Sequence, residues 1–138
     1  MFKNLSKSLF FIISMNEETF YYSKEILKQI QYADPNAMNC WGVIVGHNCF
    51  ALPETKERRA GIKMICNGFK HKGRVDIDLT WADDYTIKFY NKDGTKIKKT
   101  LKRVYATELC RTLDIHIESG PESPVPELQF TTTVTEVN

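Results

Sequence analysis

The chain has 138 residues, of which 42% are hydrophobic and 12% aromatic, enough for one domain that builds a core without disulfide staples. The net charge of +2 conceals three unequal parts. Residues 1–55 hold four Lys and Arg against five Asp and Glu, residues 56–103 hold fourteen against six, and residues 104–138 hold one against six. The basic middle segment, at +8, suits either an anionic partner or pairing with the acidic end of the same chain.

Residues 1–14 contain lysines followed by the short apolar run Leu9–Ile13. The run is too short for the core of a signal peptide, no small-x-small cleavage site follows it, and it is far below the length of a membrane span. We therefore expect an N-terminal extension over residues 1–14, a domain that starts near Met15, and a cytoplasmic protein that does not enter a membrane.

Helical periodicity first appears over residues 17–32, where apolar side chains recur at intervals of three and four. An Asp-Pro pair after this stretch predicts its end. Residues 37–45 (AMNCWGVIV) and 49–52 (CFAL) then suggest two strands, joined by a turn at Gly46.

Three strands between Gly61 and Tyr90 fix one another's register, because one pairing puts every apolar side chain on one face. We expect the two hairpin loops at residues 69–72 and 82–84, with Lys63 beside Asp78. The expected facing pairs are Cys66–Val75, Met64–Ile77 and Ile62–Leu79 in the first hairpin, and Trp81–Tyr85, Leu79–Ile87, Ile77–Phe89, Thr80–Thr86 and Asp78–Lys88 in the second.

The sequence Asn-Lys-Asp-Gly at residues 91–94 predicts a three-residue hairpin loop, with Gly94 in the left-handed region. Under that loop Phe89 faces Ile97 and Tyr85 faces Leu101. The strand that follows alternates with its lysines outward, which is typical of the charged edge of a sheet.

Helical intervals return from Tyr105 to Ile117, and Ser-Gly-Pro at residues 119–121 predicts the end of this second helix. The predicted fold class is α+β: an antiparallel β-meander of five or six strands, with the N-terminal and C-terminal helices packed on one face. This single domain covers residues 15–118, and residues 119–138 form a C-terminal tail.

No motif for nucleophilic catalysis, zinc hydrolysis or nucleotide binding is present, so we expect a protein without enzymatic activity, cofactor or metal. His47 and Cys49 offer two metal ligands, but no tight ligand pair completes a zinc site. An alternative is a metal-dependent phosphodiesterase that uses Asp76, Asp78 and Asp84. The competing interpretation is a salt-bridged sheet surface, because lysines flank Asp78 in the expected register.

Eight basic residues of the middle segment are the candidate partner-binding surface, and all lie outside the apolar register. They are Arg58, Arg59, Lys70, Lys72, Arg74, Lys98, Lys99 and Lys102. We expect reversal of Arg58, Arg59 and Lys72 to Glu to abolish binding without unfolding the domain. Because Phe69, Trp81 and Tyr90 are interleaved with them, an alternative function is a nucleic-acid-binding accessory protein, with bases stacked on the aromatic rings.

The order of these elements resembles that of small uncharacterised proteins of phages and mobile elements. The resemblance covers roughly residues 24–118 and rests on two patterns, V-x-I-x-L-x-x-x-D-x-Y-x-V-x-F and V-Y-x-x-x-L. The matching residues are Val75, Ile77, Leu79, Asp84, Tyr85, Thr86, Ile87 and Phe89, then Val104, Tyr105 and Leu109. Some such proteins look like inhibitors of host defence, including anti-CRISPR proteins. The resemblance therefore implies a non-catalytic protein that binds a host defence protein or ribonucleoprotein.

Overall fold

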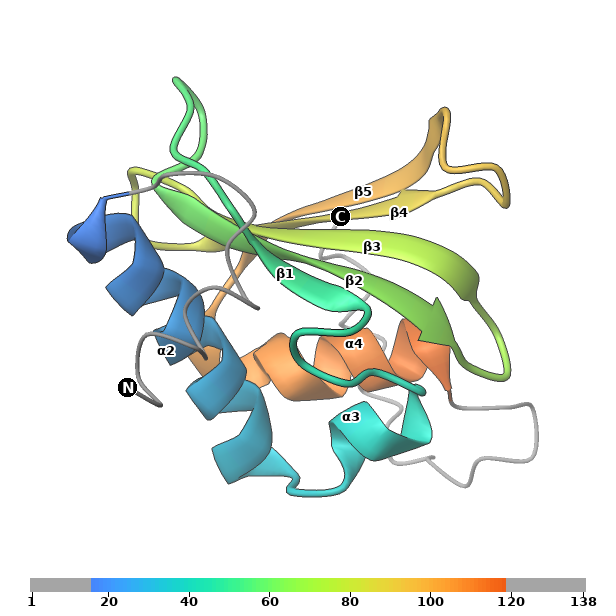
Figure 1. Ribbon diagram of the computed structural model, residues 1–138. Helices are drawn as coiled ribbons and strands as arrows, with labels where there is room; N and C mark the ends of the chain where they lie inside the picture. The colour runs from blue at the N-terminus through green and yellow to red at the C-terminus, as the bar shows by residue number, and fades with distance from the viewer. Residues whose placement is uncertain (1–15, 119–138) are drawn as a thin grey trace.

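The computed structural model describes residues 16–118 as one antiparallel sheet, in the order β1-β2-β3-β4-β5, with the helices on one of its faces (Figure 1). The elements are α2 (Glu17–Ala33), α3 (Ala37–Cys40), β1 (Cys49–Leu52), β2 (Ala60–Asn67), β3 (Lys72–Leu79), β4 (Tyr85–Tyr90), β5 (Ile97–Val104), η1 (Ala106–Glu108) and α4 (Leu109–Ile117). The α+β prediction is confirmed, with five strands. The predicted N-terminal extension and C-terminal tail lie outside the described residues.

Helix α2 forms where the periodicity predicts it and begins at a capped N-terminus. The Asn16 side chain accepts a hydrogen bond from the backbone N–H of Thr19 at 2.8 Å, and two glutamates occupy the first turn, where the helix dipole favours negative charge. Its buried stripe packs on β2, where the Ser23 hydroxyl donates to the Gly61 carbonyl at 3.0 Å. This contact fixes the helix against the apolar face of the sheet.

The strand predicted over residues 37–45 is wrong, because its first part forms the short helix α3. The backbone N–H of Trp41 bonds to the Ala37 carbonyl at 3.0 Å, and the indole N–H of Trp41 donates to Asp114 Oδ1 at 3.0 Å. Met38 and Trp41 are thereby buried under one face of the sheet. Only Val45 of this stretch makes a β-bridge, with Cys49 at the start of β1.

The expected pairings of both hairpins are wrong by two residues, although the side chains of the strands lie on the faces that were predicted. Trp81, expected opposite Tyr85, is instead exposed in the β3–β4 loop. The β2–β3 loop closes with Gly68 N–H on the His71 carbonyl at 3.0 Å, and the β3–β4 loop closes with Thr80 N–H on the Asp84 carbonyl at 2.9 Å. Each loop therefore starts one residue earlier than expected. The observed pairs include Ile62↔Ile77 and Met64↔Val75 in the first hairpin, and Leu79↔Tyr85, Ile77↔Ile87, Val75↔Phe89 and Asp76↔Lys88 in the second.

Gly94 has the predicted left-handed conformation, at φ 77°, but the pairing of the last hairpin is also wrong. Phe89 lies opposite Lys99, and Tyr85 lies opposite Val104. The predicted three-residue loop is one residue too short, because the Asn91 N–H donates to the Lys96 carbonyl at 2.9 Å. Two irregularities in the β4–β5 ladder, one near each end, account for the rest of the difference. Strand β5 is an outer strand of the sheet, as the outward lysines predicted.

Candidate functional site

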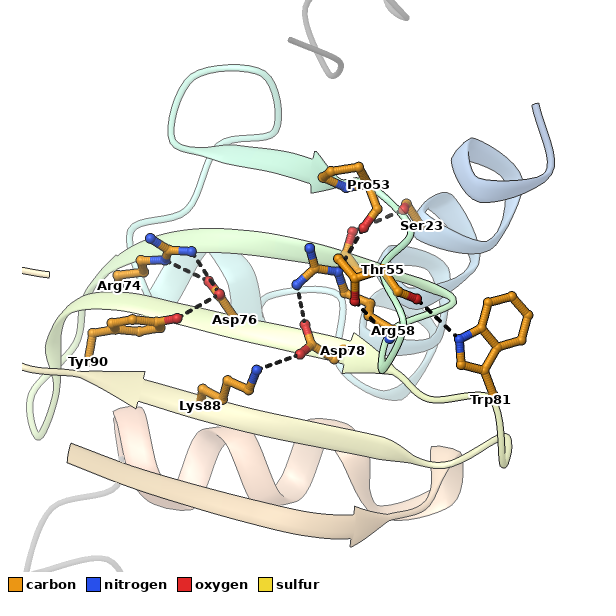
Figure 2. Close-up of polar contacts among 11 residues, drawn as sticks. Ser23, Pro53, Thr55, Arg58, Arg74, Asp76, Asp78, Trp81, Lys88 and Tyr90 are labelled. Atoms are coloured by element: carbon orange, nitrogen blue, oxygen red, sulfur yellow. Dashed lines mark hydrogen bonds and ion pairs between the residues drawn. The ribbon is translucent and has the colours of Figure 1, made fainter. Parts of the chain in front are cut away.

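Two buried carboxylates lie on the face of β3 that is turned away from the helices. Asp78 has a side chain only 6% exposed, held between Arg58 Nη1 at 3.3 Å and Lys88 Nζ at 3.1 Å (Figure 2). The predicted ion pair with Lys88 is confirmed. The expected neighbour Lys63 lies opposite Asp76 instead, and Arg58 takes its place.

Asp76 is held by a two-pronged arginine contact on the same face. Arg74 Nε and Nη2 donate to its two oxygens at 2.8 Å each, and the Tyr90 hydroxyl adds a hydrogen bond at 3.2 Å (Figure 2). The Arg74 guanidinium also lies over the Tyr90 ring, 4.4 Å from its centre. The hydrogen bonds to Asp76 raise the pKa of Arg74, and burial raises the pKa of Tyr90. These groups form a closed charge-balanced unit.

The β1–β2 loop, residues 53–59, carries two more arginines into intramolecular contacts. Arg58 Nε donates to the Pro53 carbonyl at 2.9 Å, which aims its guanidinium at Asp78. Arg59 lies over the Tyr22 ring at 4.2 Å and pairs with Glu18 at 3.4 Å and Asp83 at 3.6 Å. All three arginines of the predicted binding surface are thus engaged with acidic groups of this chain.

The two lysines of the β2–β3 loop region are bound to backbone carbonyls. Lys70 Nζ donates to the Ile115 carbonyl at 3.0 Å, and Lys72 Nζ donates to the Gly68 carbonyl at 2.8 Å. The first contact places a positive charge at the C-terminal end of α4, where the helix dipole favours it. Each ammonium group keeps further donors, because a lysine has three N–H bonds.

The cations of β5 differ from the arginines, because Lys98, Lys99 and Lys102 have no ion pair within residues 16–118. The irregularities of the ladder also bring successive cations together. Lys98 and Lys99 both border a hollow beside α4. Lys102 and Arg103 both border a second hollow on the face of the sheet that is turned away from the helices, which we call the open face. Sequence reasoning missed Arg103, which has a left-handed φ of 57°, because strict alternation was assumed along the strand.

The hollow on the open face is balanced in charge. It has a volume of about 350 Å³, and its lining includes three acidic and three basic side chains, namely Glu57, Asp78 and Asp84 against Lys88, Lys102 and Arg103. The third carboxylate of the proposed phosphodiesterase centre, Asp84, accepts a hydrogen bond from the Thr80 hydroxyl at 2.6 Å. Within residues 16–118, no three His, Cys, Asp or Glu side chains are grouped so as to hold a metal ion.

The three aromatic side chains of the predicted stacking surface do not gather beside the cations of β5. The Trp81 indole N–H donates to the Thr55 carbonyl at 3.3 Å (Figure 2), and Tyr90 lies beneath Arg74. Phe69 is exposed in the β2–β3 loop, at the opposite end of β3 from Trp81. The three rings therefore do not form one stacking surface.

Comparisons with protein-family models, with curated proteins and with solved structures found no match to this chain. In the part of the chain that the structure describes, no helix is both long and apolar enough to cross a membrane. The contacts of the charged side chains are therefore the basis for a functional proposal.

Proposed function

We propose that this chain is a non-catalytic binding protein of the phage or mobile-element type, which holds an acidic surface of a host defence protein or ribonucleoprotein against β5. The observation that carries the proposal is the contrast between the two sets of cations. The arginines at positions 58, 59 and 74 are paired with carboxylates, whereas Lys98, Lys99, Lys102 and Arg103 have no ion pair within residues 16–118.

A surface of unpaired cations on an outer strand favours an acidic partner, because complementary potentials steer the encounter and fix its register. The partner gains these contacts without first breaking an internal ion pair. Opening the Arg74 pair, in contrast, would leave a carboxylate that is 2% exposed without its counter-ion. The lysines of β5 are therefore the part of the predicted basic surface that has neither an ion pair nor a hydrogen bond to a backbone carbonyl within residues 16–118, unlike Lys70 and Lys72.

A protein partner is favoured over nucleic acid by the placement of the aromatic rings. Single-stranded nucleic acid binds where bases stack on aromatic side chains beside the cations. Here Tyr90 is covered by Arg74, and Trp81 is tied to the β1–β2 loop and lies near Arg59. The row of cations on β5 is suited to carboxylates that approach along one edge of the sheet.

The test is capture from host lysate with three forms of the immobilised protein: wild type, the pair Lys98→Glu and Lys102→Glu, and a matched control. The control reverses two exposed lysines elsewhere, Lys24→Glu and Lys56→Glu, so that the net charge changes equally. We expect one discrete protein to be retained by wild type and control, lost by the β5 variant, and released by added salt.

Mass spectrometry of the bound fraction, with and without nuclease treatment, identifies the proteins that each form retains. A protein that all three forms retain equally contradicts the proposal, and so does the absence of any retained protein. Retention that disappears after nuclease treatment identifies nucleic acid as the partner and also overturns it. Circular dichroism of each variant checks that the loss does not come from unfolding.

A further inference from the structure

The hollow beside α4 gathers side chains that lie far apart in the sequence. Its volume is about 260 Å³, and three elements and one loop meet around it. The lining residues are Lys70 and His71 from the β2–β3 loop, Phe89 from β4, Lys98 and Lys99 from β5, and His116 from α4. We call it the basic hollow.

Close packing between the β2–β3 loop and the end of α4 gives the basic hollow a fixed shape (Figure 1). A Cβ at Gly68 would collide with the backbone carbonyl of Ile117, so only glycine allows this approach. The backbone N–H of Lys70 donates to the same carbonyl at 2.8 Å, and Phe69 N–H donates to Glu118 Oε1 at 3.1 Å. The loop is thereby fastened to the helix on one side of the hollow.

The charge of the basic hollow is one-sided. Within residues 16–118, its lining contains three lysines and no Asp or Glu, whereas the lining of the open-face hollow is balanced. The carboxylates at this end of α4 are engaged elsewhere, Glu118 with Phe69 N–H and Asp114 with the Trp41 indole. Several cations around one concave surface, with no carboxylate among them, raise the local concentration of anions.

The two histidines of the lining each keep one ring nitrogen that can accept a hydrogen bond. His71 Nε2 lies 3.2 Å from the Arg74 carbonyl, and His116 Nδ1 lies 2.8 Å from the Thr112 carbonyl. A carbonyl only accepts, so these two nitrogens carry the hydrogens of the neutral rings. His71 Nδ1 and His116 Nε2 then hold lone pairs, and neither has a hydrogen-bond partner within residues 16–118.

The surroundings keep both rings neutral. Burial lowers the pKa of His71 and of His116 from the ordinary 6.5. The charge of Lys98 adds to the effect at His71, and the charges of Lys99 and Lys70 add to it at His116. Both rings also lie against Phe89, with ring centres 5.3 and 5.4 Å away. An anion placed among these groups would favour protonation of the rings.

We propose that the basic hollow binds the phosphate group of a ligand, with Lys70, Lys98 and Lys99 facing its negative charge and one of the two imidazoles accepting a hydrogen bond from its hydroxyl. Three ammonium groups suit an ion that carries close to two negative charges. A phosphate with its second pKa near about 6 still carries a hydroxyl part of the time at neutral pH, so it can donate to an imidazole lone pair. Sulfate and carboxylate lack that proton, which favours phosphate over both.

The phosphate site is a proposal separate from the protein partner, because inorganic phosphate can test it when no partner is present. The experiment titrates inorganic phosphate into the full chain at low ionic strength and follows backbone amide and histidine ring signals by nuclear magnetic resonance. We expect saturable shifts at Lys70, His71, Lys99 and His116. At pH 7.5 sulfate binds more weakly than phosphate, and its binding strengthens only well below the ordinary histidine pKa of 6.5, because burial lowers the pKa of both rings.

Two variants, each lacking one cation of β5, distinguish binding in the basic hollow from non-specific attraction of phosphate to the basic strand. Lys99→Gln removes a cation of the basic hollow, and we expect phosphate to bind about tenfold more weakly. Lys102→Gln removes a cation of the open-face hollow and leaves phosphate binding unchanged. His116→Gln abolishes the preference for phosphate over sulfate. Circular dichroism confirms that each variant is folded.

Absence of saturable shifts in the wild-type protein overturns the proposal, as does equal weakening by Lys99→Gln and Lys102→Gln. A second arm, run at about pH 6 so that about half of the phosphoserine keeps its hydroxyl, compares inorganic phosphate with a peptide that carries one phosphoserine. Tighter binding of the peptide assigns the phosphate to a modified protein, and equal or weaker binding assigns it to a free ion or small metabolite. Both outcomes support a phosphate site.

Discussion

Removal of the Arg58 side chain should destabilise the fold, because Arg58 is half of a buried ion pair. Arg58 and Asp78 are 3.3 Å apart, with side chains only 14% and 6% exposed. In an Arg58→Ala variant, Asp78 keeps Lys88 at 3.1 Å as its remaining charged partner. The Pro53 carbonyl also loses the hydrogen bond from Arg58 Nε.

The expected loss follows from the burial of the two charges. Breaking a fully buried pair by removing one partner costs about 3–5 kcal/mol. Lys88 still neutralises Asp78, and Arg58 is not wholly buried, so we expect a loss of about 2–3 kcal/mol in the free energy of unfolding. For a domain of this size, such a loss lowers the melting temperature by roughly 10 °C.

Urea unfolding followed by circular dichroism measures this loss, with Lys102→Ala as the control. Lys102 is exposed and has no ion pair within residues 16–118, so its removal should change stability by less than about 0.5 kcal/mol. If Arg58→Ala costs no more than Lys102→Ala, Arg58 is not held by Asp78 and returns to the candidate binding surface. A cycle with Asp78→Asn then measures the coupling directly.

Three further predictions concern the core, the histidines and the thiols. Leu79→Ala should cost about 2–5 kcal/mol in urea unfolding, because this side chain is buried, and a loss below 1 kcal/mol would be too small for a core position. Because the pKa values of His71 and His116 are lowered in the fold, the unfolded chain binds more protons than the folded one. The contribution of the two histidines to stability is therefore full above about pH 6.5 and falls as the pH is lowered. Thermal melts across that pH range should show a weaker pH dependence for a variant with both histidines replaced by Gln. Cys40 is exposed, and the other three thiols are buried with raised pKa values. A disulfide reagent should therefore modify one thiol in the native protein and four in urea. Rapid reaction of a second thiol in the native protein would contradict the burial of the other three.

The faces of β2, β3 and β4 were predictable from the sequence, but their pairing was not. Moving a strand by one residue turns its apolar side chains outward, whereas moving it by two keeps them all inside. The apolar pattern therefore cannot distinguish Ile77 opposite Ile87 from Ile77 opposite Phe89. The turn decides, and its left-handed position is occupied by Asp83, at φ 68°, where a glycine would have marked it in the sequence.

The basic hollow could not be predicted, because it depends on tertiary contacts and on an irregular strand. His71 and His116 are 45 positions apart, and they meet around Phe89 only after α4 packs beside the β2–β3 loop. Strict alternation puts Lys98 and Lys99 on opposite faces, yet both border the hollow. The candidate cations were identifiable by type, and their division into paired arginines and unpaired lysines required the structure.

The most direct test of β5 as the binding surface is a titration with poly-glutamate, a simple acidic polypeptide, followed through the backbone amide signals. We predict that the largest shifts fall along residues 97–104 and that they disappear in the Lys98→Glu and Lys102→Glu variant. Shifts centred on the β1–β2 loop and its Arg58 and Arg59, or spread evenly over the basic residues, would contradict the assignment of the binding surface to β5.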